Sequence, residues 1–135
     1  MLRNLKTPLK SIAVLSFVLL AAPFIKPDTA LAGGFKSSCR SAMLQEGGAW
    51  LTAVCAQTDG AVTRSRLRIS DHIANRNGVL AWGGGGFTSS CRAISFVNGE
   101  KLLAQCGNGR GGWRSTAIIL NDKISNQDGV LAVDR

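Results

Sequence analysis

A ten-residue segment occurs twice in this chain, and it constrains the fold more than any other feature of the sequence. Residues 71–80 read Asp-His-Ile-Ala-Asn-Arg-Asn-Gly-Val-Leu and residues 122–131 read Asp-Lys-Ile-Ser-Asn-Gln-Asp-Gly-Val-Leu, so six of the ten positions are identical. Each copy places an Asn-Gly or Asp-Gly turn between apolar residues. Because Gly adopts positive φ without a steric clash and such turns suit antiparallel strands, the segment predicts two β-hairpins.

The repetition extends beyond the hairpins, since a Phe-x-Ser-Ser-Cys motif occurs at residues 35–39 and again at 87–91. We therefore expect two units of about fifty residues. Repeat 1 spans about 34–82 and repeat 2 about 86–133, with a glycine hinge at 83–86. One unit buries too little apolar surface to fold well alone, so the repeats are predicted to form a single domain over residues 33–135.

The pattern of side chains within the repeats is that of strands. In residues 64–69 three arginines alternate with Ser65, Leu67 and Ile69, which is the period of a strand with one basic face. Residues 115–120 are nearly continuous in apolar residues and predict a more buried strand. No helical apolar stripe of useful length follows residue 32, so the predicted fold class is all-β.

Residues 1–32 have the features of a secretory signal peptide. Basic residues precede an apolar run at 11–24, and Ala30-Leu31-Ala32 supplies the small residues of a cleavage site. The alternative is a membrane anchor, but the run is shorter than the roughly 20 residues that a spanning helix needs. Cleavage after Ala32 would leave 12 basic and 7 acidic residues, a net charge of +5 instead of +8. We expect a secreted protein, extracellular or periplasmic, with no membrane span after cleavage.

The four cysteines, Cys39, Cys55, Cys91 and Cys106, predict disulfides, because export brings an even set into an oxidising compartment. Three pairings are possible, and a duplicated unit favours the same bridge in each copy, Cys39 with Cys55 and Cys91 with Cys106. Each bridge would close a loop of about fifteen residues and contribute roughly 3 kcal/mol in the chain-entropy description. A zinc site is the rival, but no pair has the short spacing of structural zinc and His72 is the single histidine. No metal and no cofactor is predicted.

Taken together, these motifs resemble the cyanovirin-N homology domain, a family of small exported lectins built from two tandem repeats. The resemblance covers residues 34–133. It rests on the two Phe-x-x-x-Cys motifs, on the segments 71–75 and 122–131, and on Gly78, Leu80 and Trp82. It implies a pseudo-symmetric all-β fold in which the repeats exchange strands, two disulfides within the repeats, and two distant sites for mannose-rich glycans.

The resemblance also implies, position by position, which residues bind sugar. Each cleft combines the Phe-x-Ser-Ser-Cys end of one repeat with the hairpin turn of the other. Short polar side chains suit this task, because they meet vicinal hydroxyls with directed hydrogen bonds. The first cleft would use Ser37, Ser38, Thr58, Asn126 and Asp128, and the second would use Asn75, Asn77, Ser89, Ser90 and Asn108.

The chain departs from the family pattern in both clefts. Members often carry acidic residues where this chain has Ala56, Ala74 and Ser89, and Arg where it has Gly109. Charged partners make the stronger hydrogen bonds, so these departures weaken binding, above all in the second cleft. The first cleft is favoured because Asp128 and Thr58 are hydrogen-bonding groups there. The polar residues of both turns could also be turn formers and nothing more, since Asn and Asp suit such turns.

The three tryptophans are candidates for stacking on sugar rings. Trp82, beside the first hairpin, fits core packing better, as large aromatic residues of small domains usually do. Trp113 lies among glycines in a segment expected to be exposed and is the best aromatic candidate for ligand contact.

The row formed by Arg64, Arg66 and Arg68 indicates a different function, the binding of acidic polysaccharide or anionic surfaces. The alternative is a solvated strand face that protects a sheet edge. Salt would distinguish the two ligand classes, because only polyanion binding weakens steeply as ionic strength rises. No nucleic-acid recognition motif is present, so no nucleic-acid partner is predicted.

The sequence does not predict an enzyme. No nucleophile motif, carboxylate pair or phosphate-binding loop accompanies His72. A glycine hinge that folds back gives a monomer and one that extends pairs two chains, so we expect a monomer with an exchanged dimer at high concentration.

Overall fold

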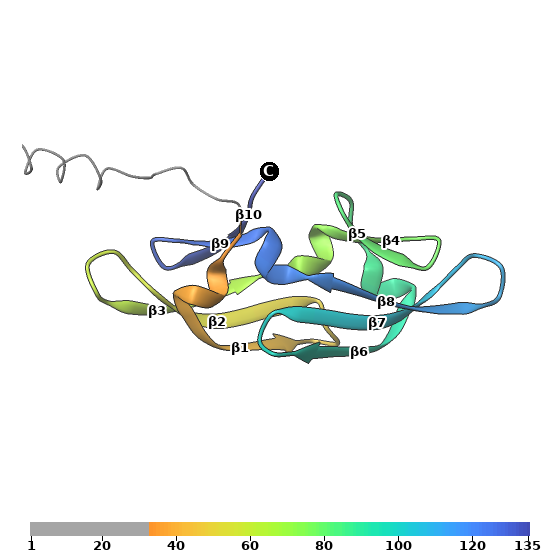
Figure 1. Ribbon diagram of the computed structural model, residues 1–135, viewed down its shortest axis with the longest axis horizontal. Helices are drawn as coiled ribbons and strands as arrows, with labels where there is room; N and C mark the ends of the chain where they lie inside the picture. The colour runs from red at the N-terminus through yellow and green to blue at the C-terminus, as the bar shows by residue number, and fades with distance from the viewer. Residues whose placement is uncertain (1–32) are drawn as a thin grey trace, which may run out of the picture. The chain divides into compact units, whose positions relative to one another are not determined.

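The computed structural model describes residues 33–135, which fall in one compact unit. The predicted signal peptide, residues 1–32, lies outside the described residues. The strands are β1 Cys39–Gln45, β2 Trp50–Ala56, β3 Val62–Leu67, β4 Ile73–Arg76, β5 Val79–Trp82, β6 Cys91–Val97, β7 Lys101–Gly107, β8 Trp113–Ile119, β9 Ile124–Gln127 and β10 Val130–Val133. They form antiparallel sheets in the orders β1-β2-β3 and β6-β7-β8, and two hairpins, β4-β5 and β9-β10 (Figure 1). The predicted all-β fold of two similar halves is confirmed.

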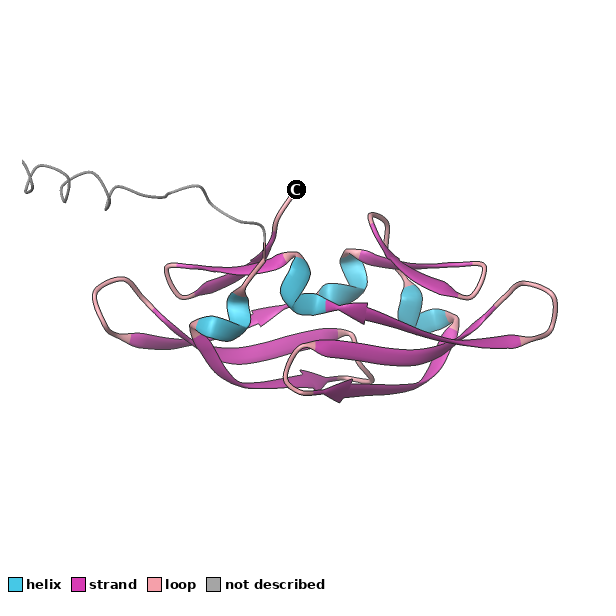
Figure 2. Ribbon diagram, viewed as in Figure 1, coloured by secondary structure: helices cyan, strands magenta, loops and turns pink. Residues whose placement is uncertain are grey.

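Short 3₁₀ turns connect these strands (Figure 2). They are η2 Phe35–Ser37, η3 Ile69–Asp71, η4 Phe87–Ser89 and η5 Leu120–Asp122. Each half thus has the same order, a turn, three strands, a second turn and a hairpin. Within residues 33–135, no helix has the length and apolar character that crossing a membrane requires.

The two duplicated segments form the predicted hairpins. Arg76 pairs with Val79, and Gln127 pairs with Val130, so each turn contains two residues. Both central residues of each turn have positive φ, 54° and 95° at Asn77 and Gly78 and 53° and 93° at Asp128 and Gly129. This is the backbone of the type I′ turn, which needs Gly at its second position and tolerates Asn or Asp at its first.

The hairpins are exchanged between the repeats. The hairpin β4-β5 of repeat 1 lies against β8 of repeat 2, and β9-β10 of repeat 2 lies against β3 of repeat 1 (Figure 1). One hydrogen bond marks each junction. The backbone N–H of Leu80 donates to the hydroxyl of Thr116 at 3.1 Å, and that of Leu131 donates to the hydroxyl of Ser65 at 2.9 Å.

A single hydrophobic core joins the two repeats. Phe35 and Phe87, the first residues of the two Phe-x-Ser-Ser-Cys motifs, are both fully buried in it. The disulfides Cys39–Cys55 and Cys91–Cys106 close the predicted loops and border the same core. Because both repeats supply this core, neither has a complete core of its own.

The four consecutive glycines at 83–86 connect β5 to η4. Backbone hydrogen bonds hold them, since the N–H of Gly83 donates to the carbonyl of His72 at 2.9 Å and that of Gly86 to the carbonyl of Ser70 at 2.8 Å. A Cβ added at Gly85 would lie 2.9 Å from the carbonyl oxygen of Ser70, so the close approach requires glycine there. Their role as a hinge between repeats stays a prediction.

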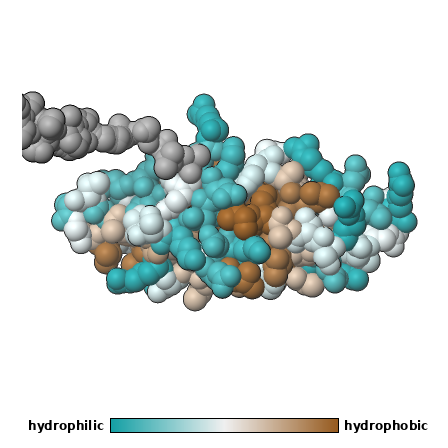
Figure 3. All heavy atoms as spheres, in the orientation of Figure 1, coloured by the Kyte–Doolittle hydropathy of each residue, from teal (hydrophilic) through white to brown (hydrophobic). Residues whose placement is uncertain are grey.

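The expectation that residues 115–120 form a more buried strand than residues 64–69 holds only by a small margin, because Ile119 is half-buried where Arg68 is exposed. Residues 115–120 bury Ile118 and Leu120, and residues 64–69 bury Ser65 and Ile69. Both strands stand at the edge of a three-stranded sheet, where alternate side chains face solvent whatever their polarity. Hydrophilic residues cover much of the face in Figure 3, with an apolar area right of the centre and smaller ones at the left and lower edge.

The hydrogen bond between Leu131 and the Ser65 hydroxyl can be used to test the exchange of hairpins between the repeats. Ser65→Ala removes the acceptor for the N–H of Leu131, and a buried N–H without a partner costs about 1–3 kcal/mol. We expect the free energy of unfolding of the oxidised protein to fall by that amount in denaturant titrations. Ser115→Ala, at an exposed position of β8, is the control and should change it little. Equal effects of the two substitutions would contradict the assignment.

Candidate functional site

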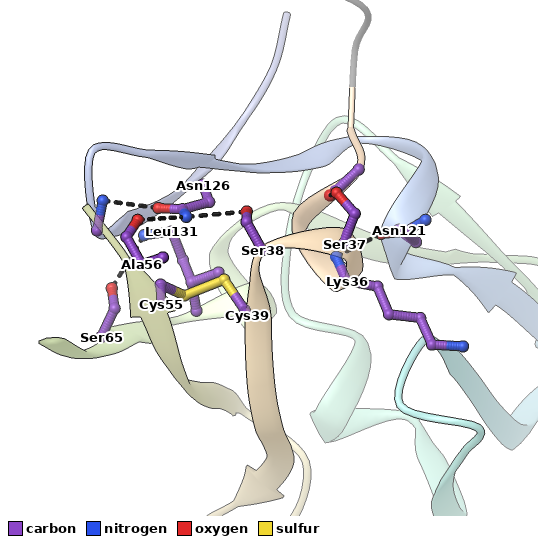
Figure 4. The surroundings of a disulfide bond; sticks show 12 residues. Lys36, Ser37, Ser38, Cys39, Cys55, Ala56, Ser65, Asn121, Asn126 and Leu131 are labelled. Carbon is purple, nitrogen blue, oxygen red and sulfur yellow. Dashed lines mark hydrogen bonds between the residues drawn. A yellow bond between two sulfur atoms is a disulfide. The ribbon is translucent and has the colours of Figure 1, made fainter. Parts of the chain in front are cut away.

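The first cleft forms where the β9-β10 hairpin meets the start of β1 and the end of β2. Asn126 spans this junction from β9 (Figure 4). Its amide nitrogen donates to the hydroxyl of Ser38 at 2.9 Å and to the carbonyl of Ala56 at 2.8 Å. Its amide oxygen accepts from the N–H of Gly129 at 2.7 Å. The side chain of Asn126 therefore fixes the hairpin turn beside the Cys39–Cys55 disulfide.

Asp128 closes the other side of the first cleft. One carboxylate oxygen accepts from the backbone N–H of Thr58 at 2.9 Å and from the Thr58 hydroxyl at 3.0 Å. These two bonds, the backbone bond first, hold the pKa of Asp128 below its ordinary value. Among the described residues, the second carboxylate oxygen accepts no hydrogen bond, and it remains available at an exposed position.

A surface hollow of about 300 Å³ lies next to these groups. Its lining includes Ser37, Ser38 and Ala56, together with Cys39, Arg40, Val54 and Val62. The hydroxyl of Ser37 donates to the carbonyl of Gly34 at 3.0 Å and so is used within its own turn. The hydroxyl of Ser38 accepts from Asn126 and keeps its own proton free to donate. The structure thus forms two hydrogen-bonded pairs across the repeats, Ser38 with Asn126 and Thr58 with Asp128.

The second cleft repeats the central bridge of the first. The amide nitrogen of Asn75 donates to the hydroxyl of Ser90 at 2.9 Å and to the carbonyl of Gly107 at 3.0 Å, and its oxygen accepts from the N–H of Gly78 at 2.7 Å. The hydroxyl of Ser89 donates to the carbonyl of Gly86 at 2.8 Å, as Ser37 does to Gly34.

The hollow in the second cleft has a different lining. About 270 Å³ in volume, it is lined by Asn77, Asn108, Arg110 and Arg114. Asn108 organises the loop, because its side-chain oxygen accepts from the N–H of Arg110 at 2.7 Å and from that of Gly112 at 3.1 Å. The sequence analysis predicted Asn77 and Asn108 here but missed Arg110 and Arg114. Matching the repeats residue by residue would have found them, since they occupy the positions of Asp59 and Thr63.

The tryptophans differ in exposure. Trp82 packs against the core, as predicted. Trp113 is exposed, but its ring is covered on one side by the guanidinium of Arg92, 3.8 Å from the ring centre. Arg92 also donates to the side chain of Gln105 at 3.1 Å, so the stacked pair is held in place.

Two of the three arginines in the row, Arg66 on β3 and Arg68 just after it, form ion pairs. Arg66 forms an ion pair with Glu46 at 3.0 Å and stacks on Trp50 at 4.0 Å from the ring centre. Arg68 forms an ion pair with Asp71 at 2.6 Å. Among residues 33–135, no cluster of three or more His, Cys, Asp or Glu side chains could hold a metal ion.

The geometry defines a class of protein, a small double-repeat β-protein with two polar clefts, each built across the exchanged hairpins. The family model of the CVNH domain matches residues 35–132, and the chain belongs to the CVNH family. The resemblance read from the sequence is thereby confirmed.

Individual relatives agree with this assignment. The chain is 35% identical to the cyanovirin-N homolog of Tuber borchii over 98 residues, 72% of this chain and 95% of the relative. The solved structure of that T. borchii protein gives a TM-score of 0.67 over 74% of this chain and 98% of that chain. A microvirin–mannobiose complex is 33% identical, with a TM-score of 0.65 over 75% and 98%. The MoCVNH3 variant solved with (N-GlcNAc)4 supports the fold alone, at 24% identity and a TM-score of 0.71 over 77% and 99%.

The contact between Thr58 and Asp128 predicts a pH-dependent effect. Thr58→Val removes one of the two donors, so the pKa of Asp128 should rise toward its ordinary value while staying below it, because the backbone N–H remains. Carbon-detected NMR of the Asp128 carboxyl measures this pKa. The native state favours the carboxylate, so its contribution to stability exists above the unfolded pKa and disappears as pH falls through the folded pKa.

The matched control is Thr58→Ser, which keeps the hydroxyl and should leave the pKa of Asp128 low. An unchanged pKa in Thr58→Val would show that the hydroxyl makes no such bond in solution.

Proposed function

We propose that this protein is a lectin that binds neutral, mannose-containing glycans through its first cleft. The observation that carries the proposal is a set of two hydrogen-bonded pairs that join the repeats, Ser38 with Asn126 and Thr58 with Asp128, of which Ser38 lines a hollow. The protein acts as a binding module, without catalysis.

The free groups of the first cleft suit vicinal hydroxyls. The Ser38 hydroxyl offers a donor, and the second oxygen of Asp128 offers a charged acceptor. Because Asn126 and Thr58 already fix both side chains, a sugar would lose little affinity to the ordering of the site. Each neutral hydrogen bond contributes about 0.5–1.5 kcal/mol net, and one to a charged group about 1.5–3 kcal/mol.

Relatives support a glycan ligand. The solved microvirin complex contains mannobiose. The microvirin chain is 33% identical to this one, over 98% of its own length and 75% of this chain. We therefore assign mannose-rich glycans as the expected ligand of the first cleft.

The alternative, polyanion binding by Arg64, Arg66 and Arg68, has less support. Two of these three guanidinium groups already pair with carboxylates, which reduces the positive potential of that face.

We also propose that residues 1–32 direct export and are removed after Ala32. The contacts of Gly33 support this site. Its nitrogen donates to the carboxylate of Asp134 at 2.6 Å, and a Cβ added at Gly33 would lie 2.2 Å from the carbonyl oxygen of Asn121. Cleavage would turn this nitrogen into an ammonium group, so the hydrogen bond would become an ion pair between the two ends of the mature chain.

This ion pair can be measured. Mass spectrometry of the exported protein should give a chain that begins at Gly33. Acetylation of its amino group should lower the free energy of unfolding by about 0.5–1 kcal/mol, as expected for a partly exposed pair. In the Asp134→Asn background, acetylation should have little further effect. An equal loss in both backgrounds would mean that the two groups do not pair.

The lectin proposal is tested by NMR titration of oxidised residues 33–135 with an α-linked dimannoside. Shifts should cluster on Ser38, Thr58, Asn126 and Asp128. Asp128→Asn should weaken binding about tenfold, because it replaces a charged acceptor with a neutral one. No shifts at millimolar sugar would refute the proposal.

The matched control is Asn77→Asp, the reverse exchange at the equivalent turn of the second cleft, which should leave dimannoside binding to the first cleft unchanged. Size-exclusion chromatography of the same samples distinguishes the expected monomer from an exchanged dimer.

A further inference from the structure

We propose that the second cleft binds a saccharide that carries an oxyanion, a carboxylate or a sulfate, and so differs in ligand class from the first. The proposal rests on the proposed function in one respect, that the clefts of this fold take glycans. The juxtaposition of Arg110 and Arg114 at the hollow with Asn77 and Asn108 carries it.

The duplicated fold makes the two clefts directly comparable. Strand register places Thr63 opposite Cys55 in one repeat and Arg114 opposite Cys106 in the other. The loops between these strands close with the same backbone bond, from Gln57 to Ala61 at 2.7 Å and from Asn108 to Gly112 at 3.0 Å. Each residue of one loop therefore has a known counterpart in the other.

The counterparts reverse the charge of the site. Asp59 corresponds to Arg110, Asp128 corresponds to Asn77, and Thr63 corresponds to Arg114. These positions carry two carboxylates in the first cleft and two guanidinium groups in the second. At these matched positions the first cleft thus presents acceptors and the second presents donors, while Arg40 is the one charged residue that lines the hollow of the first cleft.

The two guanidinium groups are available for a ligand. Both arginines are exposed, and the ion pairs between side chains of residues 33–135 involve Lys36, Arg66 and Arg68 instead. The stem of Arg114 lies over the turn, since a Cβ added at Gly78 would be 2.6 Å from its Cδ. Thr63 covers Gly129 in the same way, at 2.7 Å from its methyl group. The turn itself therefore restricts where the Arg114 side chain can lie.

The remaining lining also consists of donors. The side-chain oxygen of Asn108 is occupied by two backbone N–H groups, which leaves its amide nitrogen to face a ligand. No carboxylate lines the hollow. Guanidinium groups bind carboxylates and sulfates through paired hydrogen bonds, whereas a neutral hydroxyl satisfies only one donor at a time. The hollow therefore favours an oxyanion on a sugar ring over a neutral diol.

The test is an NMR titration of the oxidised mature chain with three probes: trigalacturonate, a sulfated chondroitin disaccharide and the neutral α-linked dimannoside. Both charged sugars should shift Asn77, Asn108, Arg110 and Arg114, and their affinity should fall steeply as salt is raised to about 0.5 M. The first two probes separate a carboxylate ligand from a sulfate ligand, and a response to either supports the proposal.

A double variant of the second cleft and a control variant on β3 test which arginines bind the charged sugars. Arg110→Asp with Arg114→Thr gives the second cleft the residues of the first at these two positions and should weaken the binding of the charged sugars at least about tenfold. Arg64→Gln removes one exposed positive charge from β3 and should have little effect. The dispersion of the amide NMR spectrum, which does not depend on any ligand, reports that each variant is folded.

The two proposals fail separately. If dimannoside causes no shifts but the charged sugars bind in the second cleft, the mannose assignment is wrong and this inference still holds. Charged sugars that bind no better than dimannoside, or that lose as much affinity in Arg64→Gln as in the double variant, would overturn the inference and leave the first cleft unaffected.

Discussion

The exchange of hairpins between the repeats is the constraint on which the rest of the structure depends. Each hairpin crosses to the other half and is anchored there by an asparagine amide, Asn75 or Asn126, and by a hydroxyl of the receiving strand, Thr116 or Ser65. A common core follows from the exchange, because each hairpin packs against a strand of the opposite repeat and its buried residues join the same cluster. The clefts follow from it too, since each lies at a crossing.

This arrangement separates what holds the clefts together from what they recognise. The asparagine bridge, the adjacent serine and the type I′ turn occur at both ends and use the same backbone partners. The residues around them differ in charge between the two clefts and do not belong to the core. Duplication therefore supplies two copies of one rigid frame, whose rims can evolve different charge without a cost in folding.

Local electrostatics decide which surface is available to a ligand. The arginines of β3 look like a binding face in the sequence, yet the fold places Glu46 and Asp71 beside two of them. Arg110 and Arg114 have no such neighbours in the described chain. The net charge of the protein indicates neither outcome, because what matters is the distance from each guanidinium to the nearest carboxylate.

The sequence by itself determined the hairpins, the disulfide pairs and the family, because all three depend on residues close together in the chain or on the repeat itself. It also identified Ser38, Thr58, Asn126 and Asp128 as a group, through the family pattern. Only the tertiary structure decided that Arg114 lies over the turn at Gly78, and that the apolar strand after Trp113 is an edge strand. Those facts depend on contacts between residues far apart in the chain, which packing of the exchanged hairpins creates and no local pattern encodes.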